Sequence, residues 1–178
     1  MSGMKPNLDD NRAVIVVVCG VAGVGKTTIG RLLAQELGWE FYDADNFHPA
    51  ANIEKMKAGI PLTDEDRQPW LDRLQQLIKG CLAAHENAVV ACSALKRAYR
   101  DRLRVTDEVR LVFLRADRAR IAEQLQRRRG HFMPETLLGS QLTDLEEPQP
   151  DEHALTVDVE GLPQDVTSLI KTKLSLQS

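Results

Sequence analysis

The segment GVAGVGKT, at positions 20–27, contains the residue types that bind a nucleoside triphosphate. It fits the spacing G-x-x-x-x-G-K-[ST], in which glycines let successive backbone N–H groups face phosphate oxygens. In this pattern the Lys26 ammonium reaches the β- and γ-phosphates, and the Thr27 hydroxyl is a ligand of Mg²⁺. We therefore predict that ATP and Mg²⁺ bind here. The predicted nucleotide contacts come from Gly20, Val21, Ala22, Gly23, Val24, Gly25, Lys26, Thr27 and Thr28.

A glycine-rich turn could also do no more than connect a strand to a helix. The residues on either side favour the phosphate-binding interpretation. Residues 13–19 form a continuous, largely β-branched run that is typical of a central parallel strand. Residues 26–37 then place apolar side chains at helical spacing, and Gly38 follows as the expected C-cap. A helix that begins at the turn adds its positive N-terminal end to the phosphate site.

Two aspartates, Asp43 and Asp45, close the second predicted strand, which begins at position 40. At i and i+2 on a strand end, they are expected to point the same way at the sheet edge where α/β proteins bind ligands. The third predicted strand, residues 88–92, runs into Ser93 and offers no acid for a metal. We therefore assign Asp43 to the metal and Asp45 to proton abstraction from a substrate hydroxyl. The alternative is a pair of solvated acids.

Strands and helices alternate along the remainder of the chain. Pro69 is expected near the first turn of a helix, because proline breaks a helix interior. The alternation predicts an α/β fold in which a parallel sheet has helices on both faces. We expect a disordered tail at residues 1–12 and a single domain at residues 13–178. The later strands are predicted at residues 88–92, 109–114 and 154–159.

Length and composition limit the classes of function that fit this chain. Its 178 residues correspond to one domain, and a formal net charge of −3 does not favour nucleic acid or acidic membranes as partners. Arginines gather between positions 93 and 131, where phosphate handling or a solvated helix face explains them better than a nucleic-acid patch does. Three cysteines without paired spacing indicate reduced thiols, and the polar, acidic start is unlike a signal or transit peptide. We expect a cytoplasmic protein without a membrane segment.

From Asp43 onward the chain resembles the gluconate kinase (gluconokinase) family, and with the phosphate-binding turn the resemblance covers most of residues 13–160. The segment ending at Asp45 is also similar to shikimate kinases, but the block that follows it is not typical of them. The resembling segments are DADNFHP (43–49), NIEKMKAGIPLTDEDRQPWL (52–71), CSALKRAYRDRLR (92–104), RRGHF (128–132) and SQLTDLEEP (140–148). The resemblance implies a three-layer α/β/α P-loop kinase with a five-stranded parallel sheet, a mobile helical lid and a homodimeric state. It also implies transfer of the ATP γ-phosphoryl group to the 6-hydroxyl of D-gluconate.

The predicted substrate loop, at about residues 43–70, contains two further candidates besides Asp45. The guanidinium of Arg67 offers a bidentate fork suited to a carboxylate, although it could instead pair with Asp64 or Asp66. His48 is expected to contact the acceptor, although it could instead cap a turn.

Lys96 and Arg100 are four residues apart in the helix predicted after the third strand, so they share one face and could both reach the acceptor. A lid is expected at about residues 127–148. The match to the RRGHF segment assigns Arg128 to the charge on the transferring phosphoryl group, and His131 to acceptor binding. The predicted catalytic residues are thus Lys26, Asp45 and Arg128.

Two rival functions remain open. One is a kinase for another small hydroxy acid, shikimate-like, or for a nucleoside monophosphate. The other is a non-enzymatic module that binds ATP to switch a partner. A switch has no need of a substrate loop that carries two acids, a histidine and an arginine, so the sequence favours an enzyme.

Overall fold

The computed structural model describes residues 12–127 and 135–178. The expected tail lies outside them except for Arg12, whose guanidinium is 3.3 Å from the Glu108 carboxylate. Five strands form one parallel sheet in the order β2-β3-β1-β4-β5, which confirms the predicted fold class. The strands are β1 Ile15–Cys19, β2 Glu40–Asp43, β3 Ala88–Ala91, β4 Val109–Arg115 and β5 Leu155–Asp158.

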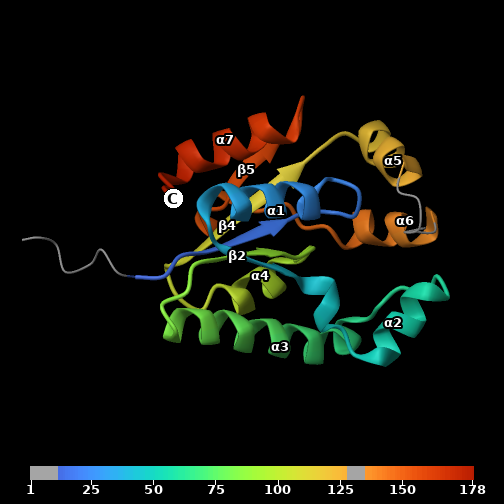
Figure 1. Ribbon diagram of the computed structural model, residues 1–178. Coiled ribbons are helices and arrows are strands. Elements are labelled where there is room, and N and C mark those ends of the chain that lie inside the picture. The colour runs from blue at the N-terminus through green and yellow to red at the C-terminus, as the bar shows by residue number, and fades with distance from the viewer. Residues whose placement is uncertain (1–11, 128–134) are drawn as a thin grey trace, which may run out of the picture.

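Helices cover both faces of this sheet, as Figure 1 shows, with α1 and α7 on one side and α3 and α4 on the other. The described α-helices are α1 Lys26–Leu37, α2 Ala50–Lys57, α3 Asp64–Ala83, α4 Arg97–Leu103, α5 Arg118–Arg127, α6 Glu135–Asp144 and α7 Pro163–Leu174. Two 3₁₀ helices span Ala44–Phe47 and Pro150–Glu152. No helix within the described ranges combines the length and the apolar character needed to cross a membrane.

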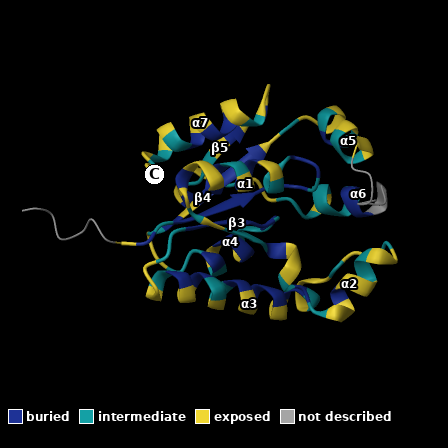
Figure 2. Ribbon diagram, viewed as in Figure 1, coloured by how far each residue is buried: buried dark blue, intermediate teal, exposed yellow. Residues whose placement is uncertain are grey.

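Strand β1 is the centre of the core and is fully buried along its length (Figure 2). Alternate side chains of a strand point to opposite faces of the sheet. Ile15, Val17 and Cys19 accordingly pack with α3 and α4, whereas Val16 and Val18 pack with α1 and α7. Burial of each of these Val or Ile side chains stabilises the fold by roughly 1.5–3 kcal/mol. The continuous apolar run was therefore a correct indication of a strand covered on both faces.

The start of α3 differs from the prediction made for Pro69. The helix begins at Asp64, so Pro69 lies in its second turn. A capping box explains the earlier start: the Asp66 N–H donates to Thr63 Oγ1 at 3.1 Å, and the Thr63 N–H donates to Asp66 Oδ2 at 2.9 Å. Proline removes only one intrahelical hydrogen bond this close to the N-terminus, so the cap and the buried face of the helix outweigh that loss.

The connections around β1 place a crevice at the carboxyl edge of the sheet. The chain leaves β1 through α1 and returns at β2, beyond β3. It leaves β3 through α4 and returns at β4, on the opposite side of β1. Because the segments after the neighbouring strands β1 and β3 diverge, the space between them is the topological switch point at which open α/β sheets bind ligands.

Candidate active site

One cavity of about 310 Å³ lies at this switch point. Its walls come from the turn after β1, the segment after β2, helices α2 and α3, and the facing helix α6 (Figure 1). The sequence-predicted residues that line it are Ala22, Lys26, Thr27, Asp43, Asp45, His48 and Arg67. The phosphate turn (residues 20–27) and the substrate loop (about residues 43–70) are distant in the sequence, but their residues share this one cavity.

The phosphate turn is held in place by its glycines and by β3. Gly20 has φ 144°, and a Cβ there would lie 2.8 Å from the carbonyl oxygen of Leu114. Its N–H donates to the carbonyl oxygen of Ser93 at 3.2 Å, which ties the turn to the end of β3. Gly25 is the left-handed N-cap of α1, and Lys26 Nζ donates to the carbonyl oxygen of Val21 at 2.9 Å. This backbone course presents N–H groups and a helix N-terminus, the groups that bind phosphate.

Helix α6 reaches this turn through Gln141. The Ala22 N–H donates to Gln141 Oε1 at 2.8 Å, and both residues line the cavity. A phosphate oxygen at this N–H would have to replace Gln141, because the N–H makes one hydrogen bond at a time. Sequence reasoning had not selected Gln141, which appeared only inside the family segment 140–148.

The two aspartates reach the cavity by a different route from the one predicted. Strand β2 ends at Asp43, whose Oδ1 accepts the Asp45 N–H at 3.0 Å as the N-cap of the 3₁₀ helix Ala44–Phe47. The expected i, i+2 arrangement on one strand is therefore wrong. Trp70 holds this short helix by donating its indole N–H to the carbonyl oxygen of Ala44 at 2.8 Å. Both carboxylates still line the cavity, and Asp45 is exposed to it.

The residues expected to bind Mg²⁺ have suitable chemistry. Thr27 and Asp43 bring a hydroxyl and a carboxylate oxygen to the same cavity. No group of three or more His, Cys, Asp and Glu able to hold a metal occurs among the described residues. Mg²⁺ usually retains water and binds one or two protein oxygens together with substrate phosphates, so a sparse oxygen set beside a phosphate turn fits it.

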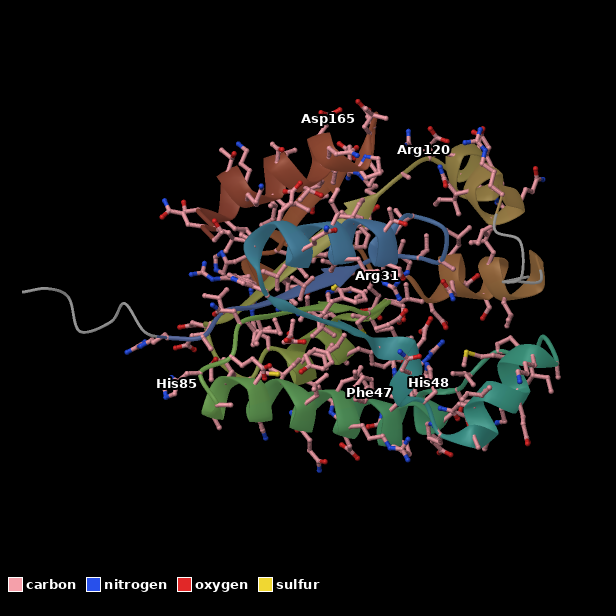
Figure 3. All side chains as sticks on the ribbon, viewed as in Figure 1. Arg31, Phe47, His48, His85, Arg120 and Asp165 are labelled. Atoms are coloured by element: carbon pink, nitrogen blue, oxygen red, sulfur yellow. The ribbon has the colours of Figure 1, made fainter. Side chains whose placement is uncertain are left out.

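His48 is buried and fixed on two sides. Its ring stacks on Trp70 with centroids 4.4 Å apart and an interplanar angle of 12°, and Nδ1 is 3.3 Å from Asn52 Nδ2. Figure 3 shows His48 beside Phe47, where the chain after β2 meets α3. Burial, together with the positive charge of Arg67, lowers the pKa of His48 to about 4. The imidazole is therefore neutral at physiological pH.

Arg67 lies at the cavity wall, and its two predicted alternative partners are wrong. Its Nη1 donates to Tyr99 Oη at 3.0 Å, and its Nη2 donates to Asp144 of α6 at 3.2 Å. Asp64 instead accepts from Tyr99 and Lys96, and Asp66 accepts from Lys55 at 2.9 Å. Tyr99 and Asp144, which sequence reasoning missed, thus set the orientation of the guanidinium.

Lys96 and Arg100 do not share a face toward the acceptor. Helix α4 begins at Arg97, so Lys96 is an extended N-cap whose ammonium is directed to Asp64 at 2.9 Å. Arg100 is 1% exposed, pairs with Glu152 at 2.7 and 3.2 Å, and donates to two backbone carbonyls at 3.0 Å. The predicted substrate contact of Arg100 is corrected to a buried ion pair between α4 and the second 3₁₀ helix. Neither cation is among the residues that line the cavity.

Arg128 and His131 lie outside the described residues, as does part of the expected lid at 127–148. The described part of that lid is helix α6 with the segment after it, together with the last residue of α5. Mobility of the lid stays a prediction.

A phosphate-binding turn between β1 and α1, facing two aspartates and an arginine across one cavity, defines a P-loop small-molecule kinase. The family model described as Shikimate kinase matches residues 22–171. A gluconokinase of Gluconobacter oxydans is 46% identical over 92% of this chain and 89% of that protein. The chain belongs to the gluconokinase family of shikimate kinase-like P-loop kinases.

Solved structures agree with this assignment. A sugar kinase from a Janibacter species superposes with a TM-score of 0.86 at 43% identity, covering 92% of this chain and 95% of that one. A gluconokinase from Sinorhizobium meliloti gives a TM-score of 0.79 at 40% identity, covering 93% and 97%.

The corrected role of Arg100 leads to a stability prediction. Replacing Glu152→Gln leaves the buried guanidinium without a counter-charge, so the free energy of unfolding should fall by about 3–5 kcal/mol in urea denaturation. Asp151→Asn is the matched control, because Asp151 pairs with Arg97 at the surface and its loss should have a much smaller effect. If Glu152→Gln keeps wild-type stability but raises the KM for the acceptor, Arg100 belongs to the substrate site after all.

Proposed function

We propose that this protein transfers the γ-phosphoryl group of ATP to the 6-hydroxyl of D-gluconate, which yields 6-phospho-D-gluconate and ADP. The observation that carries the proposal is the single cavity shared by Lys26, Asp45 and Arg67. Its volume of about 310 Å³ is at the small end of ligand sites and suits a compact polar acceptor. The gluconokinase relatives support gluconate as that acceptor.

The donor side depends on the phosphate turn. The N–H groups and the Lys26 ammonium hold the β- and γ-phosphates, and Lys26 stabilises the charge that spreads over the γ-phosphoryl oxygens. Thr27 and Asp43 would hold Mg²⁺, which would neutralise phosphate charge there. Arg128 is proposed to add a second positive charge from the lid.

Asp45 is proposed as the general base. Its carboxylate accepts the proton of the 6-hydroxyl while the hydroxyl oxygen forms a bond to the γ-phosphorus. The bond from the γ-phosphorus to the bridging oxygen breaks, and ADP leaves with that electron pair. Because such a transition state is loose, most of the catalysis comes from positioning and electrostatic stabilisation.

Arg67 is proposed to hold the carboxylate of the acceptor. Tyr99 and Asp144 accept two of the five guanidinium N–H donors, so the others can serve a carboxylate. Asp144 keeps the guanidinium charge partly balanced, which lowers the cost of holding it at the cavity wall. The homodimer and the cytoplasmic location implied by the resemblance stay predictions.

The product itself tests the proposal. Incubation with ATP, Mg²⁺ and gluconate labelled with ¹³C at C6 should give a phosphomonoester. Its ³¹P signal should be split by coupling to the labelled carbon. A phosphate on another carbon would contradict the assigned hydroxyl. The absence of any acceptor-dependent product would contradict the proposed function.

Replacement of Asp45 tests the base. Asp45→Asn should lower kcat by roughly 10²–10⁴-fold, the usual contribution of positioned proton transfer, with little change in the KM for ATP. Asp43→Asn is the comparison, and raising the Mg²⁺ concentration should partly restore its activity. If Mg²⁺ instead restored the activity of Asp45→Asn, the roles assigned to Asp43 and Asp45 would have to be exchanged. A near-normal kcat for Asp45→Asn would contradict the assignment of Asp45 as general base.

Replacement of Arg67 tests carboxylate binding. Arg67→Ala should raise the KM for gluconate far more than the KM for ATP, because the guanidinium is proposed to bind the acceptor and not the nucleotide. Arg73→Ala is the matched control on α3, since its guanidinium is exposed and donates to the carbonyl oxygen of Phe47 at 3.1 Å. Equal increases in both KM values would indicate that Arg67 has a structural role through Asp144.

A further inference from the structure

The hydrogen bond from Asn52 to the backbone of Asp66 fixes the orientation of the Asn52 side-chain amide. Asn52 is 4% exposed, and its Nδ2 donates to the backbone carbonyl oxygen of Asp66 at 2.8 Å. A carbonyl oxygen only accepts hydrogen bonds, so the atom facing it must be the amide nitrogen. The second N–H of the same nitrogen is then available to His48 Nδ1, 3.3 Å away.

This amide determines which ring nitrogen of His48 carries the proton. Since Asn52 donates, Nδ1 must accept, and the neutral imidazole is therefore protonated on Nε2. Burial and the charge of Arg67 lower the pKa of His48 to about 4, so the ring stays in this neutral form near pH 7. His48 can then donate a hydrogen bond but is not suited to act as an acid.

The Nε2–H group is the polar atom of the His48 ring that remains available to a ligand. Stacking on Trp70 covers one face of the ring, and Asn52 occupies Nδ1. No described residue accepts from Nε2, yet the described part of the chain contains no buried side-chain N or O atom without a partner. Nε2 is therefore accessible, and His48 lines the cavity.

We propose that Asn52 is a positioning residue that holds His48 as an Nε2–H donor to an oxygen of the acceptor. This inference rests on the proposed function, because it concerns the same cavity and a hydroxylated acid as acceptor. The neutral donor complements Arg67: the guanidinium selects the charged carboxylate, and the imidazole selects an uncharged or partly charged oxygen. A donor fixed in one tautomer favours an oxygen acceptor over an N–H or apolar group at that point, since either would leave the Nε2–H unpaired.

The variants His48→Gln and His48→Asn separate the roles of the two ring nitrogens. The amide nitrogen of His48→Gln can lie near the original Nε2, whereas that of His48→Asn lies near Nδ1. His48→Asn should raise the KM for gluconate about tenfold, the value of one hydrogen bond, and His48→Gln should raise it less, with the KM for ATP unchanged in both. His85→Asn is the control, because His85 lies at the far end of α3 (Figure 3). Equal KM values for the two His48 variants would overturn the proposal.

The tautomer gives a readout that does not depend on activity. Long-range ¹H–¹⁵N spectra of the wild type should show His48 protonated on Nε2, and Asn52→Ala should yield a mixture of tautomers and a raised KM for gluconate. An Nδ1–H tautomer in the wild type would overturn the role of Asn52. Should the wild type fail to phosphorylate gluconate, the proposed function fails, while the spectra still decide whether Asn52 sets the tautomer.

Discussion

The whole site depends on the divergence of the chain after two neighbouring parallel strands, β1 and β3. Their backbones are hydrogen-bonded along the sheet, but their following segments run to opposite sides of it. The phosphate turn fills one side of the resulting crevice, and the carbonyl oxygen of Ser93 after β3 accepts the first N–H of that turn. Strand β1 is fully buried, and most of the cavity-lining residues lie on the turns and helices that follow the strands.

Helix α6 joins the two halves of the cavity. Gln141 contacts the phosphate turn and Asp144 contacts Arg67, and residues three apart lie on one face of a helix. The polar contacts of the acceptor wall continue through Tyr99 to Asp64 and Lys96. The same helix therefore contacts both the donor site and the acceptor site. Its position determines whether Gln141 occupies the Ala22 N–H and whether Asp144 holds the Arg67 guanidinium.

Local sequence rules predicted the features that depend on neighbouring residues. The phosphate turn, helix α1 and the buried strand β1 follow from glycine spacing and apolar periodicity. Features set by distant partners escaped them. Arg100 looked like a ligand because its buried partner Glu152 is 52 residues away, and Asn52 had no visible role until Asp66 and His48 came together. Asp45 was expected to point from a strand end, but it lines the cavity from a 3₁₀ helix that Asp43 caps and that sequence periodicity does not reveal.

In this account the cavity brings ATP and one hydroxylated acid together, and the γ-phosphoryl group is transferred from ATP to that acid. A coupled assay of ADP release, with gluconate beside shikimate, glycerate and AMP at equal ATP and Mg²⁺, measures that claim directly. Gluconate should give the highest kcat/KM of the four by a wide margin. A higher value for any of the other three, or ADP release that no acceptor increases, would contradict it.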